Sequence, residues 1–132
     1  MKVHGACHCG AVTWEGEADP AKVTVCHCGD CQRLSGAAFR ASVPVKAEDF
    51  VLRGDPVRYV KTAESGNRRA QGFCGRCGTP VYSADAENPA SFNLRIGGLA
   101  EREALPPLRQ IWCESALPWS ADLLDVPATA KQ

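Results

Sequence analysis

The spacing of the cysteines constrains this chain more strongly than any other feature of its sequence. Seven of the eight cysteines form three tight groups, which are Cys7-His8-Cys9, Cys26-His27-Cys28-Gly29-Asp30-Cys31 and Cys74-Gly75-Arg76-Cys77. Cysteines so close in sequence would form strained disulfides with one another, whereas their thiolates can share a metal ion without strain. The spacing therefore favours metal binding in a reducing compartment over a disulfide framework in a secreted protein.

Length and charge limit the remaining possibilities. The 132 residues fit one domain, which we expect to span residues 1–132. Fifteen Lys and Arg balance fifteen Asp and Glu, so there is no broad positive field to attract nucleic acid or an anionic membrane. Residues 1–8 lack the apolar stretch of a secretory signal, and no membrane-spanning run of about 18 apolar residues follows. We therefore expect a cytoplasmic protein with no nucleic-acid or membrane partner.

Short stretches of alternating apolar and polar residues recur between turn signals, which is the pattern of an all-β fold. The expected strands lie at residues 11–17, 23–25, 39–45, 50–52, 57–60, 69–73, 81–84, 91–96 and 108–113. Only two places look helical, residues 30–34 and residues 46–49, and both are too short to be stable without tertiary contacts. We expect the three tryptophans to lie in the core or in a pocket wall, namely Trp14, Trp112 and Trp119.

The first predicted metal site combines Cys7 and Cys9 with Cys74 and Cys77. A Cys-x-Cys unit on an extended segment points both sulfurs to the same face, because strand side chains alternate with period two. The Cys-x-x-Cys turn followed by Gly78 resembles a zinc knuckle. Four thiolates in a tetrahedron form a closed, structural zinc site, which here would join two distant parts of the chain. The alternative is that these residues are buried free thiols or disulfides.

The second predicted site consists of Cys26, Cys28 and Cys31, a set of three without an obvious fourth partner nearby. Three protein ligands and one open position are typical of a catalytic zinc. Three thiolates reduce the Lewis acidity of the metal, so the site suits a substrate thiolate or oxygen that enters the fourth position. On an extended segment His27 would point away from the sulfurs, which makes it a neighbour of the site rather than a ligand.

Two alternatives for this second cluster remain open. It could be a second structural site completed by Cys113, His4 or His8, or a metal-free trio of low-pKa thiolates that oxidise. Cys113 lies in an apolar stretch, where we expect a small buried side chain rather than a ligand. Just after the cluster, Gln32 and Arg33 are candidates for substrate contacts, Arg33 through a bidentate bond to a carboxylate. Arg33 could equally be a solvated surface residue.

Three segments in this order resemble one known family. They are Gly5-Ala6-Cys7-His8-Cys9-Gly10-Ala11-Val12, Cys26-His27-Cys28-Gly29-Asp30-Cys31-Gln32-Arg33 and Phe73-Cys74-Gly75-Arg76-Cys77-Gly78-Thr79. Together they resemble the glutathione-dependent formaldehyde-activating enzyme family, which includes the centromere protein V type. Later segments extend the resemblance over residues 5–119. The chain departs from the family at Gln110, where a His often precedes the Ile-Trp of the last strand.

The resemblance implies an all-β fold of folded antiparallel sheets, similar to the Mss4-like β-tent, with few short helical turns. The activity it implies is that of a carbon–sulfur lyase that condenses formaldehyde with glutathione to S-(hydroxymethyl)glutathione. The partner would then be a small thiol or thiol adduct. Two zinc ions per chain are implied, a structural one and a second, catalytic one. Their ligands would be Cys7, Cys9, Cys74 and Cys77 for the first, and Cys26, Cys28 and Cys31 for the second.

Two other functions remain compatible with these residues. A non-catalytic zinc module that binds a protein partner would use the same fold and the same cysteines. Methionine sulfoxide reduction on a related zinc fold would need a reactive cysteine late in the chain, a position that Cys113 alone occupies. The sequence identifies neither a general acid or base nor an oligomeric state.

Overall fold

The computed structural model describes all 132 residues and places ten strands in two sheets. The smaller sheet has the order β1-β2-β5, with β1 at Lys2–Ala6, β2 at Thr13–Glu17 and β5 at Val51–Arg53. The larger sheet has the order β10-β3-β4-β9-β8-β7-β6, and all its neighbouring strands are antiparallel except β10 and β3. Its strands are β3 (Thr24–Cys26), β4 (Arg40–Lys46), β6 (Val57–Thr62), β7 (Arg68–Phe73), β8 (Pro80–Asp85), β9 (Ser91–Arg95) and β10 (Arg109–Ile111).

The prediction of an all-β fold with few short helical turns is confirmed, with two differences among the strands. Strand β1 was not expected, because only Val3 of its five residues is buried and no alternating pattern marks it. The last strand, β10, ends at Ile111 rather than at residue 113, because the following Trp112 has the left-handed backbone conformation, with φ 58°. Cys113 consequently lies outside the sheet and is exposed, so the expectation of a buried side chain there is wrong.

Both expected helical turns are present. The first is helix α1 (Gly29–Ser35), which ends at Gly36 in the left-handed conformation that glycine favours. The second is the 3₁₀ turn η2 (Ala47–Asp49). Further 3₁₀ turns are η1 (Pro20–Lys22), η3 (Ile96–Gly98), η4 (Arg102–Ala104), η5 (Cys113–Ser115), η6 (Pro118–Ala121) and η7 (Leu123–Asp125). No helix has the length and apolar character needed to cross a membrane.

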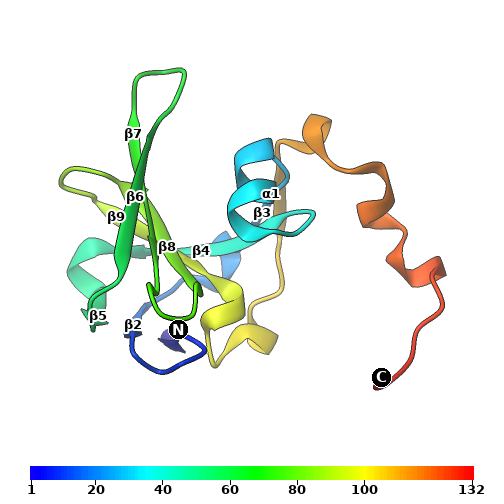
Figure 1. Ribbon diagram of the computed structural model, residues 1–132, viewed down its shortest axis with the longest axis horizontal. Helices are drawn as coiled ribbons and strands as arrows, with labels where there is room; N and C mark the ends of the chain where they lie inside the picture. Colours follow the sequence, from blue (N-terminus) through cyan, green and yellow to red (C-terminus); the bar gives the residue numbers. More distant parts are fainter.

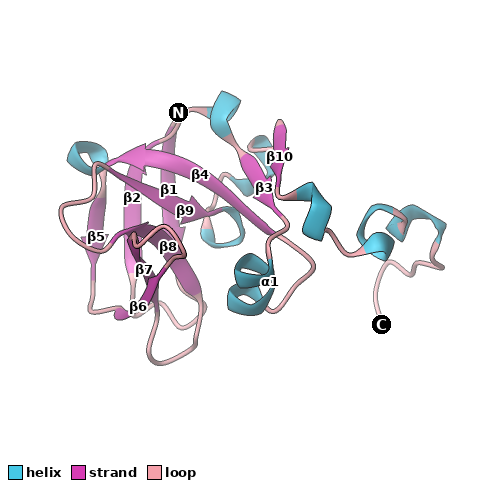
Figure 2. Cartoon of the chain, turned by 90° about the horizontal axis from the view of Figure 1, so that it is seen from above, coloured by secondary structure: helices cyan, strands magenta, loops and turns pink.

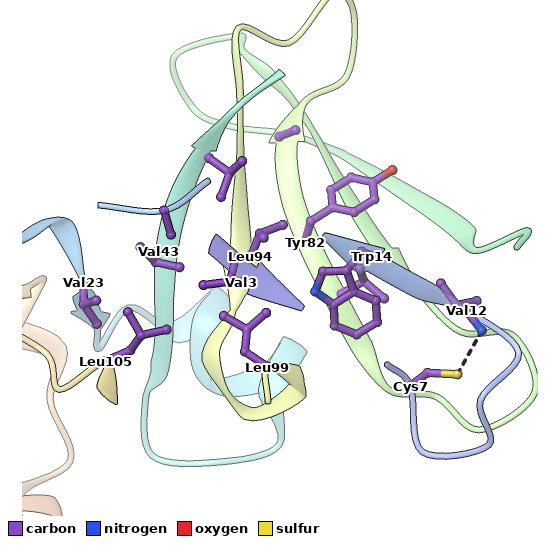
Figure 3. Packing of buried hydrophobic residues seen from close by; sticks show 14 of the residues in the cluster. Val3, Cys7, Val12, Trp14, Val23, Val43, Tyr82, Leu94, Leu99 and Leu105 are labelled. Carbon is purple, nitrogen blue, oxygen red and sulfur yellow. Dashed lines mark hydrogen bonds between the residues drawn. The ribbon is translucent and has the colours of Figure 1, made fainter. Parts of the chain in front are cut away.

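The hydrophobic core lies between the two sheets (Figure 3). Strands β1 and β2 contribute Val3 and Trp14, and strands β4 and β9 contribute Val43 and Leu94. Trp14 requires the glycine at position 5, because a Cβ on Gly5 would come within 2.0 Å of the indole ring. Truncation of such a buried ring to alanine typically costs about 3–5 kcal/mol of unfolding free energy. The core therefore holds the small sheet against one face of the large one.

The opposite face of the seven-stranded sheet is polar and curved. Along β4, Val43 faces the core while Arg40 and Ser42 lie on the other side, as the two-residue period of a strand requires. Lys61 on the edge strand β6 forms an ion pair with Asp30 of α1, although α1 directly follows β3 near the other edge. The sheet therefore curls over its polar face, with α1 next to the end of β4 (Figure 2).

The chain ends in a segment that projects away from both sheets, shown in orange and red in Figure 1. It contains η6 and η7, and several of its large apolar side chains are exposed, among them Trp119 and Leu124. The expectation of a core or pocket position is therefore wrong for Trp119. It is confirmed for Trp14, which is buried in the core, and for Trp112, which lines a cavity.

Candidate metal centres and the adjoining cavity

The structure brings Cys7, Cys9, Cys74 and Cys77 together, and their four sulfurs all lie within 4.8 Å of one another. The Sγ–Sγ distances are 3.6 Å between Cys7 and Cys9 and 3.7 Å between Cys9 and Cys74. A disulfide would require about 2.05 Å. Four sulfurs at about 2.3 Å from a central zinc ion would be about 3.8 Å apart. The geometry thus fits a tetrahedral metal site and not a pair of disulfides.

Two turns position these four sulfurs. Cys7 and Cys9 lie in the turn from β1 to β2, not on an extended segment, so the sequence argument from strand alternation is wrong for this pair. The backbone N–H of Val12 donates to Cys7 Sγ at 3.2 Å (Figure 3). In the turn from β7 to β8, Cys77 Sγ lies 3.1 Å from Thr79 Oγ1. Hydrogen bonds of this kind stabilise thiolates, which are the metal-binding form of cysteine.

The thiols of this first cluster differ in acidity. Hydrogen bonds from the Thr79 side chain and backbone lower the pKa of Cys77 to about 5. The backbone N–H of Ala11 also stabilises the thiolate of Cys9, but desolvation and the three neighbouring thiols outweigh it and raise the pKa of Cys9 to about 11. Different pKa values are expected for neighbouring thiols that titrate together, because the negative charge stays on the sulfur that its surroundings stabilise best. A cation at the centre would stabilise all four thiolates.

The second set, Cys26, Cys28 and Cys31, is also brought together, with its three sulfurs within 4.8 Å of one another. Cys26 ends β3, Cys28 is the N-cap of α1, and Cys31 lies in the first turn of α1. The backbone N–H of Cys31 donates to Cys28 Sγ at 3.4 Å. The strand-to-helix junction therefore determines how these three sulfurs face one another.

Burial also acts on this cluster, in which Cys31 is buried and Cys26 and Cys28 are half-buried. Desolvation raises the pKa of Cys26, and it raises the pKa of Cys31 to about 12 although the charge of Arg40 acts in the other direction. Desolvation acts in the same way on Cys28, but the hydrogen bond from the Cys31 backbone and the neighbouring thiols lower its pKa overall. Metal binding must therefore displace protons from Cys26 and Cys31.

His27 lies outside the cluster of sulfurs, as the extended segment predicted. Its Nε2 lies 2.8 Å from Gln110 Oε1, and its ring packs edge-on against Phe39 with the centroids 5.6 Å apart. Because an amide oxygen only accepts, Nε2 carries the proton, which leaves the buried Nδ1 without a partner. Gln110, the departure from the family pattern, therefore determines the tautomer of His27.

None of the proposed fourth ligands reaches the second cluster. His4 is held by Glu101, with Nδ1 2.8 Å from the carboxylate, and the backbone N–H of exposed His8 donates to Thr79 Oγ1 at 3.0 Å. Cys113 is exposed in η5. The groups of potential ligands within 4.8 Å of one another contain none of these three residues, so the second cluster has three protein sulfurs only.

The two predicted substrate contacts occupy different positions. Gln32 donates its side-chain amide to the backbone carbonyls of His27 at 2.8 Å and Ser115 at 3.0 Å, and thereby ties the C-terminal segment to α1. Arg33 is exposed on α1 and forms no hydrogen bond or ion pair. A role in substrate binding stays a prediction for both residues.

A cavity of about 590 Å³ lies over the polar face of the large sheet and reaches the second cluster through Cys26 and Cys31. Trp112 and Ile111 form part of its wall. Apart from Ala21 and Pro44, the remaining lining is polar or charged and comes from β3, β4, β7, β8, β9, β10 and η1. The second cluster is thus open to a cavity of ligand size, and no cysteine of the first cluster lines this cavity.

Two arginines meet in the lining of this cavity. Arg95 Nη2 donates to Gln71 Oε1 at 3.1 Å and Arg40 Nη1 donates to the same oxygen at 3.0 Å, while Arg95 Nη1 donates to Ser42 Oγ at 2.6 Å. Desolvation, together with the charge of Arg40, lowers the pKa of Arg95 to about 9. Sequence reasoning missed this network, because its residues alternate with apolar ones and resemble the solvent face of ordinary strands.

The chain was compared with known proteins. The sequence profile of the glutathione-dependent formaldehyde-activating enzyme family matches residues 2–115. A Halomonas elongata protein whose name assigns it to these enzymes is 27% identical over 94 residues, which cover 67% of this chain and 60% of that relative. This chain therefore matches less than two thirds of that protein's length.

A crystal structure of a Rhodobacter sphaeroides protein is similar in fold. The TM-score is 0.62 at 23% sequence identity, over 83% of this chain and 99% of that one. The structural likeness supports the arrangement of the sheets, while the sequence profile covers both cysteine clusters and the lining of the cavity. On this evidence the chain belongs to the glutathione-dependent formaldehyde-activating enzyme family.

Proposed function

We propose that this protein is a zinc-dependent carbon–sulfur lyase that acts on a small thiol and formaldehyde, with glutathione as the first candidate thiol. The observation that carries the proposal is the position of Cys26 and Cys31, which lie in both the three-sulfur cluster and the cavity wall. A cluster of three ligands beside a cavity leaves room for a fourth ligand from a bound molecule.

The residues of each cluster have distinct roles in this proposal. Cys7, Cys9, Cys74 and Cys77 would hold a structural zinc ion that joins the turn after β1 to the turn after β7. Cys26, Cys28 and Cys31 would hold a second zinc ion, which would lower the pKa of an incoming thiol and keep it as a thiolate. Reduced cysteines of this kind also suit the cytoplasm, which stays the predicted location.

The reaction is an addition across the carbonyl group of formaldehyde. The thiol sulfur forms the new C–S bond, the C=O double bond becomes a single bond, and the proton of the thiol ends on the oxygen. Ile111 and Trp112 provide an apolar part of the cavity wall. The contribution of the protein is then proximity and stabilisation of the thiolate.

The test is the rate of adduct formation from glutathione and formaldehyde, followed by exchange NMR with zinc-loaded protein. We expect acceleration over the spontaneous reaction, loss of that acceleration in Cys28→Ser, and normal activity in Cys113→Ser. Cys113 is a matched control because it is an exposed cysteine outside both clusters. Fully zinc-loaded protein that gives no acceleration would exclude glutathione as the thiol.

A non-catalytic module that binds a protein partner is the second candidate. The exposed apolar side chains of the projecting C-terminal segment, among them Leu123, Leu124 and Val126, favour it. In that case Cys28→Ser would leave both folding and partner binding intact, while removal of residues 116–132 would abolish partner binding. Acceleration of adduct formation that depends on Cys28 would decide against this candidate.

A further inference from the structure

The lining of the large cavity carries an imbalance of charge. It contains five cationic side chains and no acidic one, the cations being Lys22, Arg40, Arg69, Arg95 and Arg109. Two of them have carboxylate partners outside the lining, Lys22 with Asp19 at 3.7 Å and Arg69 with Asp85 at 2.6 Å. The other three arginines take part in none of the ion pairs of the chain.

Arg40 and Arg95 are the most unusual of these three. Both donate to the single amide oxygen of Gln71, which is neutral and offers no compensating charge. Arg95 is only 7% exposed, and the Nε of Arg40 is buried without a hydrogen-bond partner. Buried cations in proteins are normally paired with an anion, because the loss of hydration is costly. Two guanidinium groups side by side are the arrangement that binds a carboxylate through parallel hydrogen bonds.

This pair of arginines lies beside the second cysteine cluster. Arg40 is opposite Cys26 in the register of β3 and β4, and Ser42 is opposite Arg95 in the register of β4 and β9. Directly opposite residues on antiparallel strands have Cβ atoms about 4.5–5.5 Å apart. A small molecule with its sulfur at the cluster can therefore reach the arginines with an anionic group a few bonds away.

The charges also indicate how many anionic groups the cavity accommodates. With a divalent cation, the three cysteine thiolates and the substrate thiolate would carry a net charge of −2, against three unpaired arginines, Arg40, Arg95 and the exposed Arg109. Arg40 and Arg95 can together hold one carboxylate, which leaves Arg109 for a second. An ammonium group would find no acidic partner in the lining, so the ammonium group of glutathione would have to lie outside the cavity.

We propose that this cavity is an anion-recognition site that selects dicarboxylate thiols over neutral and cationic thiols, with one carboxylate held by Arg40 and Arg95. The inference rests on the proposed function where it places the thiol at the second cluster, and deepens it by naming the charge class of the substrate. Arg109 contacts the second carboxylate at the rim. The arginines determine specificity and take no part in forming the C–S bond.

The first experiment tests the anion site without a thiol. Zinc-loaded protein is titrated by calorimetry with succinate and with succinamide, its neutral counterpart. We expect saturable binding of succinate that weakens as salt concentration rises, and no binding of succinamide. Equal binding of the two compounds would overturn the proposal.

Variants then assign the binding to the arginines. Arg40→Ala should weaken succinate binding at least about tenfold, and Arg40→Lys should restore part of it, because the charge returns without the two-pronged geometry. Arg109→Ala changes an exposed residue and should cost about threefold without affecting folding. Arg53→Ala is the matched control, since Arg53 lies on β5 and pairs with Glu15 far from the cavity lining. Unchanged binding in both Arg40→Ala and Arg109→Ala would contradict the proposal.

A second experiment separates this inference from the proposed reaction. Mercaptosuccinate, mercaptoethanol and cysteamine are compared as ligands of the zinc-loaded protein, and we expect affinity to fall in that order by at least about tenfold per step. Succinate binding that depends on Arg40, without acceleration of any adduct formation, would support the anion site while the lyase reaction fails. Equal acceleration with all three thiols would support the reaction and overturn the anion site.

Discussion

The two cysteine clusters use the same ligand atom in different surroundings. In the first cluster four sulfurs from two turns converge, with hydrogen bonds from Val12 and Thr79, and none of the four lines the large cavity. In the second cluster three sulfurs meet at a strand-to-helix junction, and two of them line a cavity of about 590 Å³. The number of ligands and access to a cavity, rather than ligand type, distinguish a metal site suited to stability from one suited to reaction.

The largest expected effect is on stability through the first cluster. Cys74→Ser removes one buried ligand of the site that joins β1 to β7. Structural zinc ions contribute on the order of 10 kcal/mol to the folding of small domains, which is as large as the net stability of most domains. We expect loss of cooperative thermal unfolding, measured by circular dichroism. Cys113→Ser, the control, should unfold as the wild type does, and a cooperative transition in Cys74→Ser would refute a structural role.

A substitution in the second cluster should lower activity rather than stability. Cys28→Ser removes one ligand from an open site, so we expect adduct formation to fall at least about 100-fold while the fold persists. The rate of adduct formation is measured by exchange NMR, and the stability of the same sample by thermal unfolding. Global unfolding of this variant would mean that the second site is structural as well, and the contrast between the clusters would fail.

Acidification should release metal from the two sites at different pH values. Protons compete with a metal for thiolates, so a raised thiol pKa favours release at a higher pH. In the second cluster burial raises the pKa values of two of the three thiols, Cys26 and Cys31, the latter to about 12. In the first cluster the pKa of Cys9 is raised to about 11, but those of Cys7 and Cys77 are lowered, the latter to about 5, and four sulfurs rather than three are available to a metal. As pH falls, the second site should therefore lose its metal first. Zinc release followed with a chromophoric chelator would show two steps, and retention of activity after the first step would contradict this order.

The smallest expected effect concerns the hydrogen bond that holds His27 beside the second cluster. Gln110→Leu removes the acceptor of His27 Nε2 and leaves both nitrogens of this buried ring without partners. Such an unpaired polar group costs about 1–3 kcal/mol of unfolding free energy. Urea denaturation measures the loss, and Gln110→Glu, which keeps an acceptor, is the matched control. An equal loss in both variants would mean that the hydrogen bond to His27 contributes nothing.

Much of the fold and both clusters could be predicted because their signals are local. Alternating residues marked every strand of the large sheet, and the short spacings of Cys26, Cys28 and Cys31 indicated a shared site before any coordinates. The Cys-x-x-Cys spacing of Cys74 and Cys77 likewise predicts a metal-binding turn. These features depend on neighbours in the sequence, so the sequence contains the necessary information.

The charged cavity could not be predicted, because its chemistry depends on the curvature of the sheet. Arg40 and Ser42 on β4 and Arg95 on β9 alternate with apolar residues, a pattern that also describes a solvent-facing row. This row becomes the floor of a cavity only once the neighbouring strands and α1 surround it, as the lining residues from β3, β7, β8, β10 and α1 show. The exposure of Cys113 has a similar origin, since one left-handed residue, Trp112, takes it out of the strand.

The most direct test of two metal sites with different functions is the zinc content per chain. Protein purified without chelator and equilibrated with a slight excess of zinc would be analysed by elemental mass spectrometry, together with Cys28→Ser. The account predicts two zinc ions in the wild type and one in the folded variant. One zinc ion in the wild type, or none in Cys28→Ser, would contradict it.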